Sequence, residues 1–251
     1  MDLDWRCYLL LAVLALPWDS WAGTNDPLDS PMWSYHHARL LGGAPVDFDA
    51  RIEVRVPPFA EDSRQVPIEV DASAYAGDVV RILAWAELNP IAQIFDFKPG
   101  ARVAPRLAVR IRVEQATPIR AAVLTRDGRW HIGSARVDAA GGGCTAPSVV
   151  RAEAGWEERL GQVLGKRFAR GELSRLRLQV AHPMDNGLVG GIPEFFIEAA
   201  ELRGSAGQVL ASLALFPSVS ENPTLSLDLQ DDQAAELWLR DNNGNEFQAA
   251  F

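Results

Sequence analysis

From residue 46 onward, the chain repeatedly places an apolar side chain at every second position. Successive side chains of a β-strand point to opposite faces of a sheet, so this period predicts strands with one buried and one solvated face. Arginine is frequent at the alternate positions, which we expect to face water. The pattern occurs in residues 51–56, 106–113, 176–180, 225–229 and 237–239. No long stretch of helical periodicity interrupts it, so the sequence predicts an all-β protein.

Turn-forming dipeptides separate the patterned segments at spacings typical of antiparallel β folds. They are Pro57-Pro58, Asn89-Pro90, Pro99-Gly100, Asp127-Gly128, Asn222-Pro223 and Asn243-Gly244. The segments fall into two groups, each about the size of an immunoglobulin-like sandwich. We therefore predict two immunoglobulin-like antiparallel β-sandwiches in tandem, in residues 46–144 and 166–251.

Two segments lack this alternation. Residues 23–45 are rich in proline and glycine, and we expect a loose N-terminal arm that packs on the first sandwich through its aromatic side chains. Residues 145–165 are expected to be a linker with one or two helical turns, because Trp156, Leu160 and Leu164 stand at helical spacing. Glycines within this linker disfavour a longer helix.

The start of the chain has the features of an export signal. Tyr8–Leu16 is an apolar run of nine residues, too short for a bilayer-spanning helix, which needs about 20 residues. Ser20 and Ala22 are small residues at the positions that a signal peptidase recognises. We therefore expect residues 1–22 to be a signal peptide cleaved near Ala22, leaving no membrane span. The alternative is a buried strand at the start of the fold.

Charge and motifs exclude several classes of function. The formal net charge of −9 argues against nucleic acid, whose phosphates need a basic surface. The common phosphate-loop, zinc-protease, paired-cysteine and serine-hydrolase motifs are absent from the sequence. His36 and His37 could share a metal only if a turn brought them together, and His182 is expected to pack or hydrogen-bond at a strand end. We therefore predict no catalytic residue, metal or cofactor.

Removal of residues 1–22 leaves Cys144 without a second cysteine in the chain. A single thiol in an exported protein pairs with another molecule, carries a group, or is buried and inert. Gly141, Gly142 and Gly143 precede Cys144, so we expect an unshielded thiol on a flexible arm. An incidental cysteine in a glycine-rich linker is the alternative.

Reactivity of this thiol depends on its ionisation. An ordinary cysteine has a pKa near ~8.5, so only a few per cent is thiolate at neutral pH. The adjacent sequence has no cation closer than Arg136 and Arg151. Activation must therefore come from the fold or from a partner, and an unpaired Cys144 could also link two copies in a disulfide-bonded homodimer.

Several short blocks stand in the order found in a known pair of proteins. In the first half they are Ile52-Glu53-Val54, Val66-Pro67-Ile68, Asn89-Pro90-Ile91-Ala92, Arg110-Ile111-Arg112-Val113 and Gly142-Gly143-Cys144. In the second half they are His182-Pro183-Met184-Asp185-Asn186-Gly187, Ile192-Pro193-Glu194-Phe195-Phe196-Ile197 and Val219-Ser220-Glu221-Asn222-Pro223. With these blocks the sequence resembles the sulfur-carrier proteins SoxY and SoxZ fused into one chain.

The resemblance implies a periplasmic carrier that is not an enzyme and that holds a sulfur intermediate covalently on Cys144, as in thiosulfate oxidation. It implies that Gly141, Gly142 and Gly143 are the hinge of the arm and that periplasmic sulfur-oxidation enzymes are the partners. It also implies that the sandwiches pack as the SoxY–SoxZ heterodimer does. One departure is that Cys144 is internal, with 107 residues after it, whereas the SoxY cysteine lies at a free carboxyl end.

Two other classes of function are open. Fused proteins of this kind resemble a group associated with periplasmic quinoprotein dehydrogenases. The chain could therefore be an accessory interaction module of a PQQ-dependent alcohol dehydrogenase system, with a dispensable Cys144. A thiol enzyme is the other class, but it needs a nearby base and usually a resolving thiol, and no second cysteine is left after export.

Overall fold

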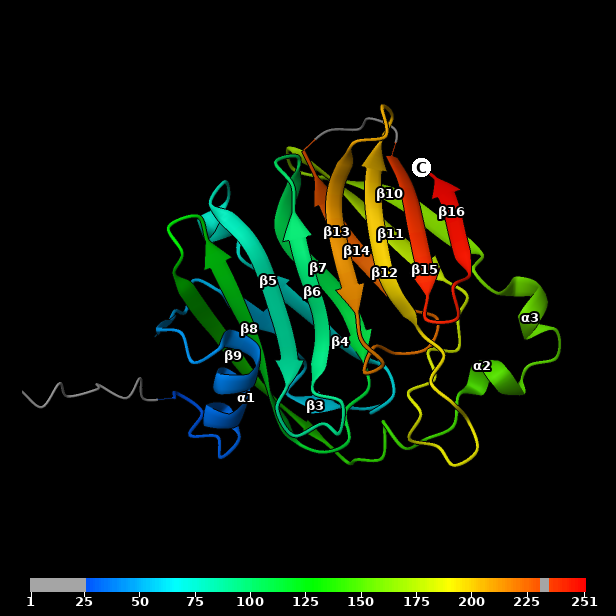
Figure 1. Ribbon diagram of the computed structural model, residues 1–251, viewed down its shortest axis with the longest axis horizontal. Helices are drawn as coiled ribbons and strands as arrows, with labels where there is room; N and C mark the ends of the chain where they lie inside the picture. The colour runs from blue at the N-terminus through cyan, green and yellow to red at the C-terminus, as the bar shows by residue number, and fades with distance from the viewer. Residues whose placement is uncertain (1–25, 231–234) are drawn as a thin grey trace, which may run out of the picture.

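The computed structural model describes residues 26–230 and 235–251, and it confirms the all-β prediction (Figure 1). Its strands form two sheets that pack face to face. The larger sheet contains, in spatial order, β1 (Val46–Phe48), β9 (Trp130–Ala139), β8 (Thr117–Thr125), β5 (Val79–Ala86), β6 (Gln93–Pro99), β13 (Val209–Leu215), β12 (Ile197–Gly204), β15 (Ala235–Asp241) and β16 (Glu246–Ala250), with β3 (Phe59–Ala60) on β9. The smaller sheet contains β10 (Val163–Arg170), β11 (Leu173–Val180), β14 (Thr224–Leu229), β7 (Val103–Ile111), β4 (Val66–Asp71) and β2 (Glu53–Arg55).

Both sheets continue from the first half of the chain into the second. In the larger sheet β6 pairs antiparallel with β13, and in the smaller sheet β7 pairs antiparallel with β14. Among the described strands, only the short β1 and β3 pair in parallel, both with β9. The two predicted sandwiches therefore lie edge to edge and share their sheets.

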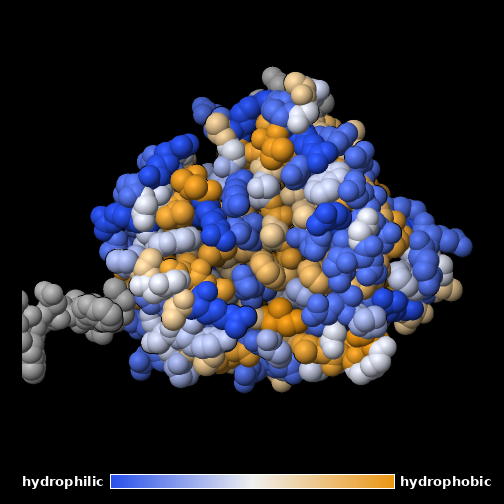
Figure 2. Space-filling view, viewed as in Figure 1, coloured by the Kyte–Doolittle hydropathy of each residue, from blue (hydrophilic) through white to orange (hydrophobic). Residues whose placement is uncertain are grey.

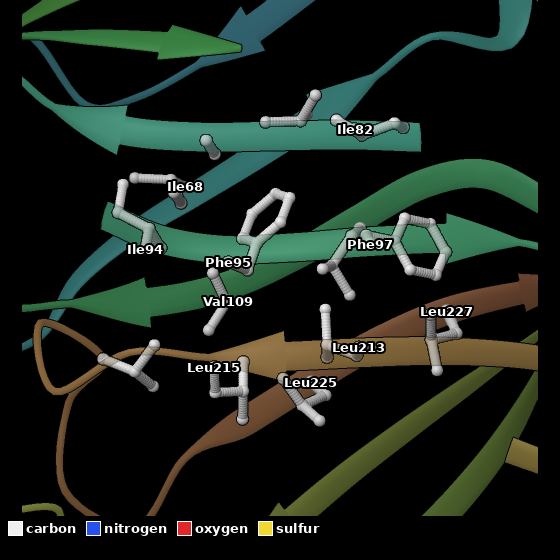
Figure 3. Packing of buried hydrophobic residues seen from close by; sticks show 14 of the residues in the cluster. Ile68, Ile82, Ile94, Phe95, Phe97, Val109, Leu213, Leu215, Leu225 and Leu227 are labelled. Atoms are coloured by element: carbon white, nitrogen blue, oxygen red, sulfur yellow. The ribbon is translucent and has the colours of Figure 1, made fainter. Parts of the chain in front are cut away.

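The core lies between the sheets and is continuous across the two halves (Figure 3). Phe95 and Phe97 of β6 lie beside Leu213 and Leu215 of β13, and all four side chains are buried. Burial of one such side chain stabilises a fold by roughly 1.5–3 kcal/mol. The shared core therefore stabilises the union of the halves as well as each half.

The predicted alternation is present in the strands. In β11, Leu176, Leu178 and Val180 are fully buried, whereas Arg177 between them is exposed. On the face shown in Figure 2, hydrophilic residues cover most of the surface and apolar residues show through in separate patches. The arginine-rich outer faces therefore keep most of the sheet surface polar.

A helix that was not predicted covers part of the larger sheet. It is α1 (Trp33–Leu41), and it lies within the segment that was expected to be a loose arm. Trp33 stacks on Trp85 of β5, with ring centroids 6.2 Å apart, so the arm packs through an aromatic side chain as expected. The helix is short and buries only Trp33, His36 and Leu41. The sequence therefore has too few apolar residues at helical spacing to predict it.

Between β9 and β10 the chain crosses one end of the sandwich and forms two short helices, α2 (Val149–Ala152) and α3 (Trp156–Arg159) (Figure 1). The predicted leader, residues 1–22, lies outside the described residues. No helix in the described ranges combines the length and the apolar character needed to cross a membrane.

Candidate functional site

The glycine run before Cys144 lies against the segment that follows β7. The N–H of Gly142 donates to the carbonyl oxygen of Glu114 at 3.1 Å, and the N–H of Gly143 donates to that of Val113 at 3.1 Å. These two hydrogen bonds join the segment that follows β9 to the segment that follows β7. In this structure the arm that carries Cys144 is therefore docked on the first half.

The absence of a side chain at Gly143 makes this docking feasible. A Cβ atom there would lie 2.1 Å from the carbonyl oxygen of Ser63 and 2.5 Å from that of Val113. Gly142, in contrast, has open space around it but a φ of 76°, which side chains rarely tolerate. The glycines thus permit a close approach of backbones, while their predicted role as a hinge stays a prediction.

Cys144 is buried, with 1% of its surface exposed. Its N–H donates to Oε2 of Glu114 at 3.0 Å, and its carbonyl oxygen accepts a hydrogen bond from Nδ2 of Asn186 at 2.6 Å. The hydroxyl of Thr145 also donates to Glu114, at 3.2 Å. The expectation of an unshielded thiol therefore differs from this structure, because fold contacts remote in sequence cover it.

The surroundings of the thiol disfavour its ionised form. Burial raises the pKa of Cys144 to about 12, the nearby carboxylate of Glu114 adds to this rise, and Arg112 opposes it. Only the thiolate attacks electrophilic sulfur. In the docked arrangement the sulfur is therefore neutral and unreactive at physiological pH.

Arg112 is the cation beside Cys144, and it corrects an expectation from the sequence. The alternation of residues 106–113 placed Arg112 on the solvated face, but its side chain is buried, with 4% of the residue exposed. Its guanidinium donates to the carbonyl oxygens of Met184 and Pro183, which belong to the second half. These backbone acceptors explain why the alternation fails at this position.

The second half of the chain also holds the far end of the arm. The carboxylate of Glu221 accepts hydrogen bonds from the hydroxyl of Ser148 at 2.6 Å and from the N–H of Val149 at 2.8 Å, at the start of α2. Arg151 of α2 forms an ion pair with Asp185. Residues of both halves therefore fix the segment that contains Cys144.

Little free space adjoins the part of the arm next to Cys144. A hollow lined by Arg112, Ala146 and Asn186 holds about 10 Å³. This volume is at the lower limit for one water molecule. The docked arrangement therefore offers no room there for thiosulfate or a polysulfide.

The histidines have separate structural roles. Nε2 of His36 bonds to the carbonyl oxygen of Glu87 at 2.9 Å, and Nε2 of His37 bonds to that of Ala44 at 2.7 Å. His182 is buried and accepts a hydrogen bond from the N–H of Met184 at 3.0 Å, in line with the packing role expected for it. Within residues 26–230 and 235–251, no three potential metal-binding side chains gather.

Sequence reasoning singled out Cys144 and its glycines but missed Glu114, Asn186 and Arg112. Asn186 lies within a block that resembles SoxZ, and Arg112 lies within a block that resembles SoxY. This resemblance was the only available signal for the two residues. Nothing in the sequence near Glu114 marks it as a partner of Cys144, because 30 residues separate the two.

Solved structures show limited similarity to the chain. The SoxY sulfur carrier protein of Chlorobium limicola f thiosulfatophilum is 20% identical with a TM-score of 0.38, covering 43% of this chain and 90% of that one. Two structures of Parabacteroides merdae β-glucuronidase, one with glycerol in the active site, are each 10% identical with a TM-score of 0.25. Each covers 80% of this chain and 24% of the glucuronidase chain. No curated protein matches.

Two protein-family models match successive parts of the chain. Residues 37–144 match the sulfur oxidation protein SoxY, and this match ends at Cys144. Residues 165–251 match the sulphur oxidation protein SoxZ. Together the matches span most of the chain, and their junction coincides with the crossing segment that carries α2 and α3. The protein therefore belongs to the SoxY/SoxZ-like sulfur-oxidation proteins, with the two domains joined in one chain.

Proposed function

We propose that the protein is a periplasmic sulfur carrier in which Cys144 holds a sulfur intermediate covalently for partner enzymes. The observation that supports this role is the position of Cys144 outside both sheets, at the end of the part that matches SoxY. The hydrogen bonds that hold Cys144 do not belong to a sheet. The arm can therefore leave its docked position while both sheets stay intact.

Sulfur loading requires this open arrangement. In water the thiol would regain a pKa near ~8.5, so a few per cent would be thiolate at neutral pH. The thiolate attacks one sulfur of a polysulfide, a new S–S bond forms, and the shortened polysulfide leaves with the electron pair of the broken S–S bond. This exchange needs no oxidant. Coupling to thiosulfate removes two electrons, which a redox partner enzyme would have to accept.

The test is intact mass spectrometry of the reduced protein after incubation with polysulfide. We expect the mass to increase by one or more sulfur atoms and to return to its original value after treatment with a thiol reductant. Cys144→Ser in a chain that also carries Cys7→Ser should show no increase, because no thiol is left. Cys7→Ser is the matched control, because it removes the other cysteine of the full chain and should load normally. An unmodified wild-type protein would contradict the proposal.

Export to the periplasm belongs to the same proposal. Residues 1–22 would be removed, so the mature protein would begin at Gly23. The mass of protein isolated from the periplasm of the producing cell tests this cleavage. Recovery of the uncleaved chain in the cytoplasm would contradict it.

A second candidate function is an accessory interaction module of a periplasmic quinoprotein dehydrogenase system. The burial of Cys144 favours it, because a sealed thiol suits a protein that has no use for it. In that case Cys144→Ser would leave growth on the alcohol substrate of the dehydrogenase unchanged, whereas deletion of the whole protein would impair it. Impaired growth of Cys144→Ser would exclude this candidate.

A further inference from the structure

We propose that Glu114 and Asn186 are positioning residues that close the Cys144 arm from two sides, so that the SoxZ-like half controls access to the thiol. The purpose of this closure rests on the proposed carrier function. The closure itself can be tested without any sulfur chemistry.

Glu114 and Asn186 bind the two polar groups of the Cys144 backbone. Glu114, from the first half, accepts from the N–H of Cys144 at 3.0 Å and from the hydroxyl of Thr145 at 3.2 Å. Asn186, from the second half, donates to the carbonyl oxygen of Cys144 at 2.6 Å. Hydrogen bonds to a charged group are stronger than those between neutral groups, so Glu114 contributes the stronger hold.

Each positioning residue is itself fixed. The N–H of Glu114 donates to Oδ1 of Asn89 at 2.9 Å. Asn186 is buried, and its own Oδ1 accepts from the N–H of Leu188 at 3.1 Å. The side-chain amide of Asn186 is therefore held in place, and the backbone that carries Glu114 is anchored beside the arm.

The charges around the arm favour the closed form only while the sulfur is neutral. Glu114 and Arg112 are the charged groups that act on Cys144. Two more carboxylates lie on neighbouring loops. That of Asp185 forms an ion pair with Arg151, and that of Glu221 accepts a hydrogen bond from Ser148. A negative charge on the sulfur would be repelled by Glu114, so ionisation and an anionic sulfur cargo both favour opening.

The experiment measures alkylation of Cys144 by iodoacetamide in the folded full chain carrying Cys7→Ser, followed by intact mass. Wild type should react much more slowly than the same protein unfolded in urea. We expect Glu114→Gln and Asn186→Ala each to accelerate alkylation by about tenfold at neutral pH, because each weakens one hold on the closed form. The rate of Glu114→Gln should also rise at lower pH than that of wild type, since the repelling carboxylate is gone.

Glu61→Gln is the matched control, because Glu61 is an exposed carboxylate of the same half and the substitution is identical. Its rate should equal that of wild type. Gly143→Ala provides a second way to open the arm, since its Cβ would meet the carbonyl oxygen of Ser63 at 2.1 Å without any change of charge. It should accelerate alkylation even if Glu114→Gln proves unable to fold.

Unfolding midpoints in urea separate local from global opening. Faster alkylation that does not increase further in dilute urea indicates that only the arm opens. Wild-type rates in both Glu114→Gln and Asn186→Ala, or an acceleration that follows global unfolding, would overturn the inference. If these variants open the arm but polysulfide adds no sulfur, the closure stands and the carrier function fails.

Discussion

His182 illustrates how burial couples a single side chain to stability. It lies against Phe195, with ring centroids 4.5 Å apart, and Nε2 is 3.8 Å from the carboxylate of Asp241. Burial lowers the pKa of His182 to about 4, and the Asp241 carboxylate acts in the opposite direction. The folded protein therefore favours neutral His182 at a pH where an unfolded chain would already be protonated.

This shift predicts a loss of stability in acid. The ordinary pKa of histidine is 6.5, so below that pH His182 of the unfolded state binds a proton. In the folded state His182 stays neutral until the pH falls to about 4. The free energy of unfolding should therefore decrease through this window, by roughly 3 kcal/mol at most. Urea unfolding across the window measures the decrease. In His182→Asn, which keeps an acceptor for Met184 but cannot titrate, the decrease should be smaller, and an equal decrease would refute the assignment.

Some residues of the candidate site could be predicted from the sequence, and others could not. Cys144 and Gly143 stand out because an unpaired cysteine after three glycines is visible in the sequence itself. Glu114 carries no signal in the sequence, and Asn186 is marked only by the block that resembles SoxZ, because their roles arise from contacts across 30 and 42 residues of chain. Arg112 was assigned to the solvated face because alternation cannot anticipate backbone acceptors supplied by another segment.

At the scale of elements, strand patterning was a better guide than helix patterning. The strands β7, β11, β14 and β15 occupy the segments in which apolar residues alternate. The helix α1 has no comparable pattern, and its first residue, Trp33, lies beside an arginine that forms two buried ion pairs. The side chain of Arg120 is fully buried between Glu87 and Asp26, at 2.7 Å from each carboxylate.

These ion pairs predict how α1 is held to the sheet. The guanidinium carbon of Arg120 also lies 5.2 Å from the ring centroid of Trp33, the first residue of α1. Arg120→Met would leave Glu87 buried without its partner, so we expect a loss of about 3–5 kcal/mol and faster hydrogen exchange in α1. Asp26→Asn, which keeps an acceptor, should cost only about 1 kcal/mol. Urea unfolding and hydrogen exchange measure both variants, and unchanged exchange in Arg120→Met would contradict this account.

At the scale of the molecule, the two halves of the chain form one structure, because they share both sheets and a continuous core. The seam consists of the β6–β13 and β7–β14 pairings and of the core beneath them. The sequence predicted two sandwiches but not this seam, because strand partners cannot be read from alternation alone. Separation of the halves would expose the edges of β6, β13, β7 and β14 together with core side chains.

The covalent link should therefore be dispensable once the protein has folded. A protease site placed between Ala154 and Gly155, in the exposed turn between α2 and α3, would allow the folded chain to be cut there. We expect the two fragments to stay together in gel filtration and to unfold in one transition, because shared apolar cores of this kind are typical of obligate interfaces. The uncut protein carrying the same site is the control. Fragments that elute separately without denaturant would show that the seam is weak, whereas fragments made separately should aggregate through the unpaired edges of β6 and β7.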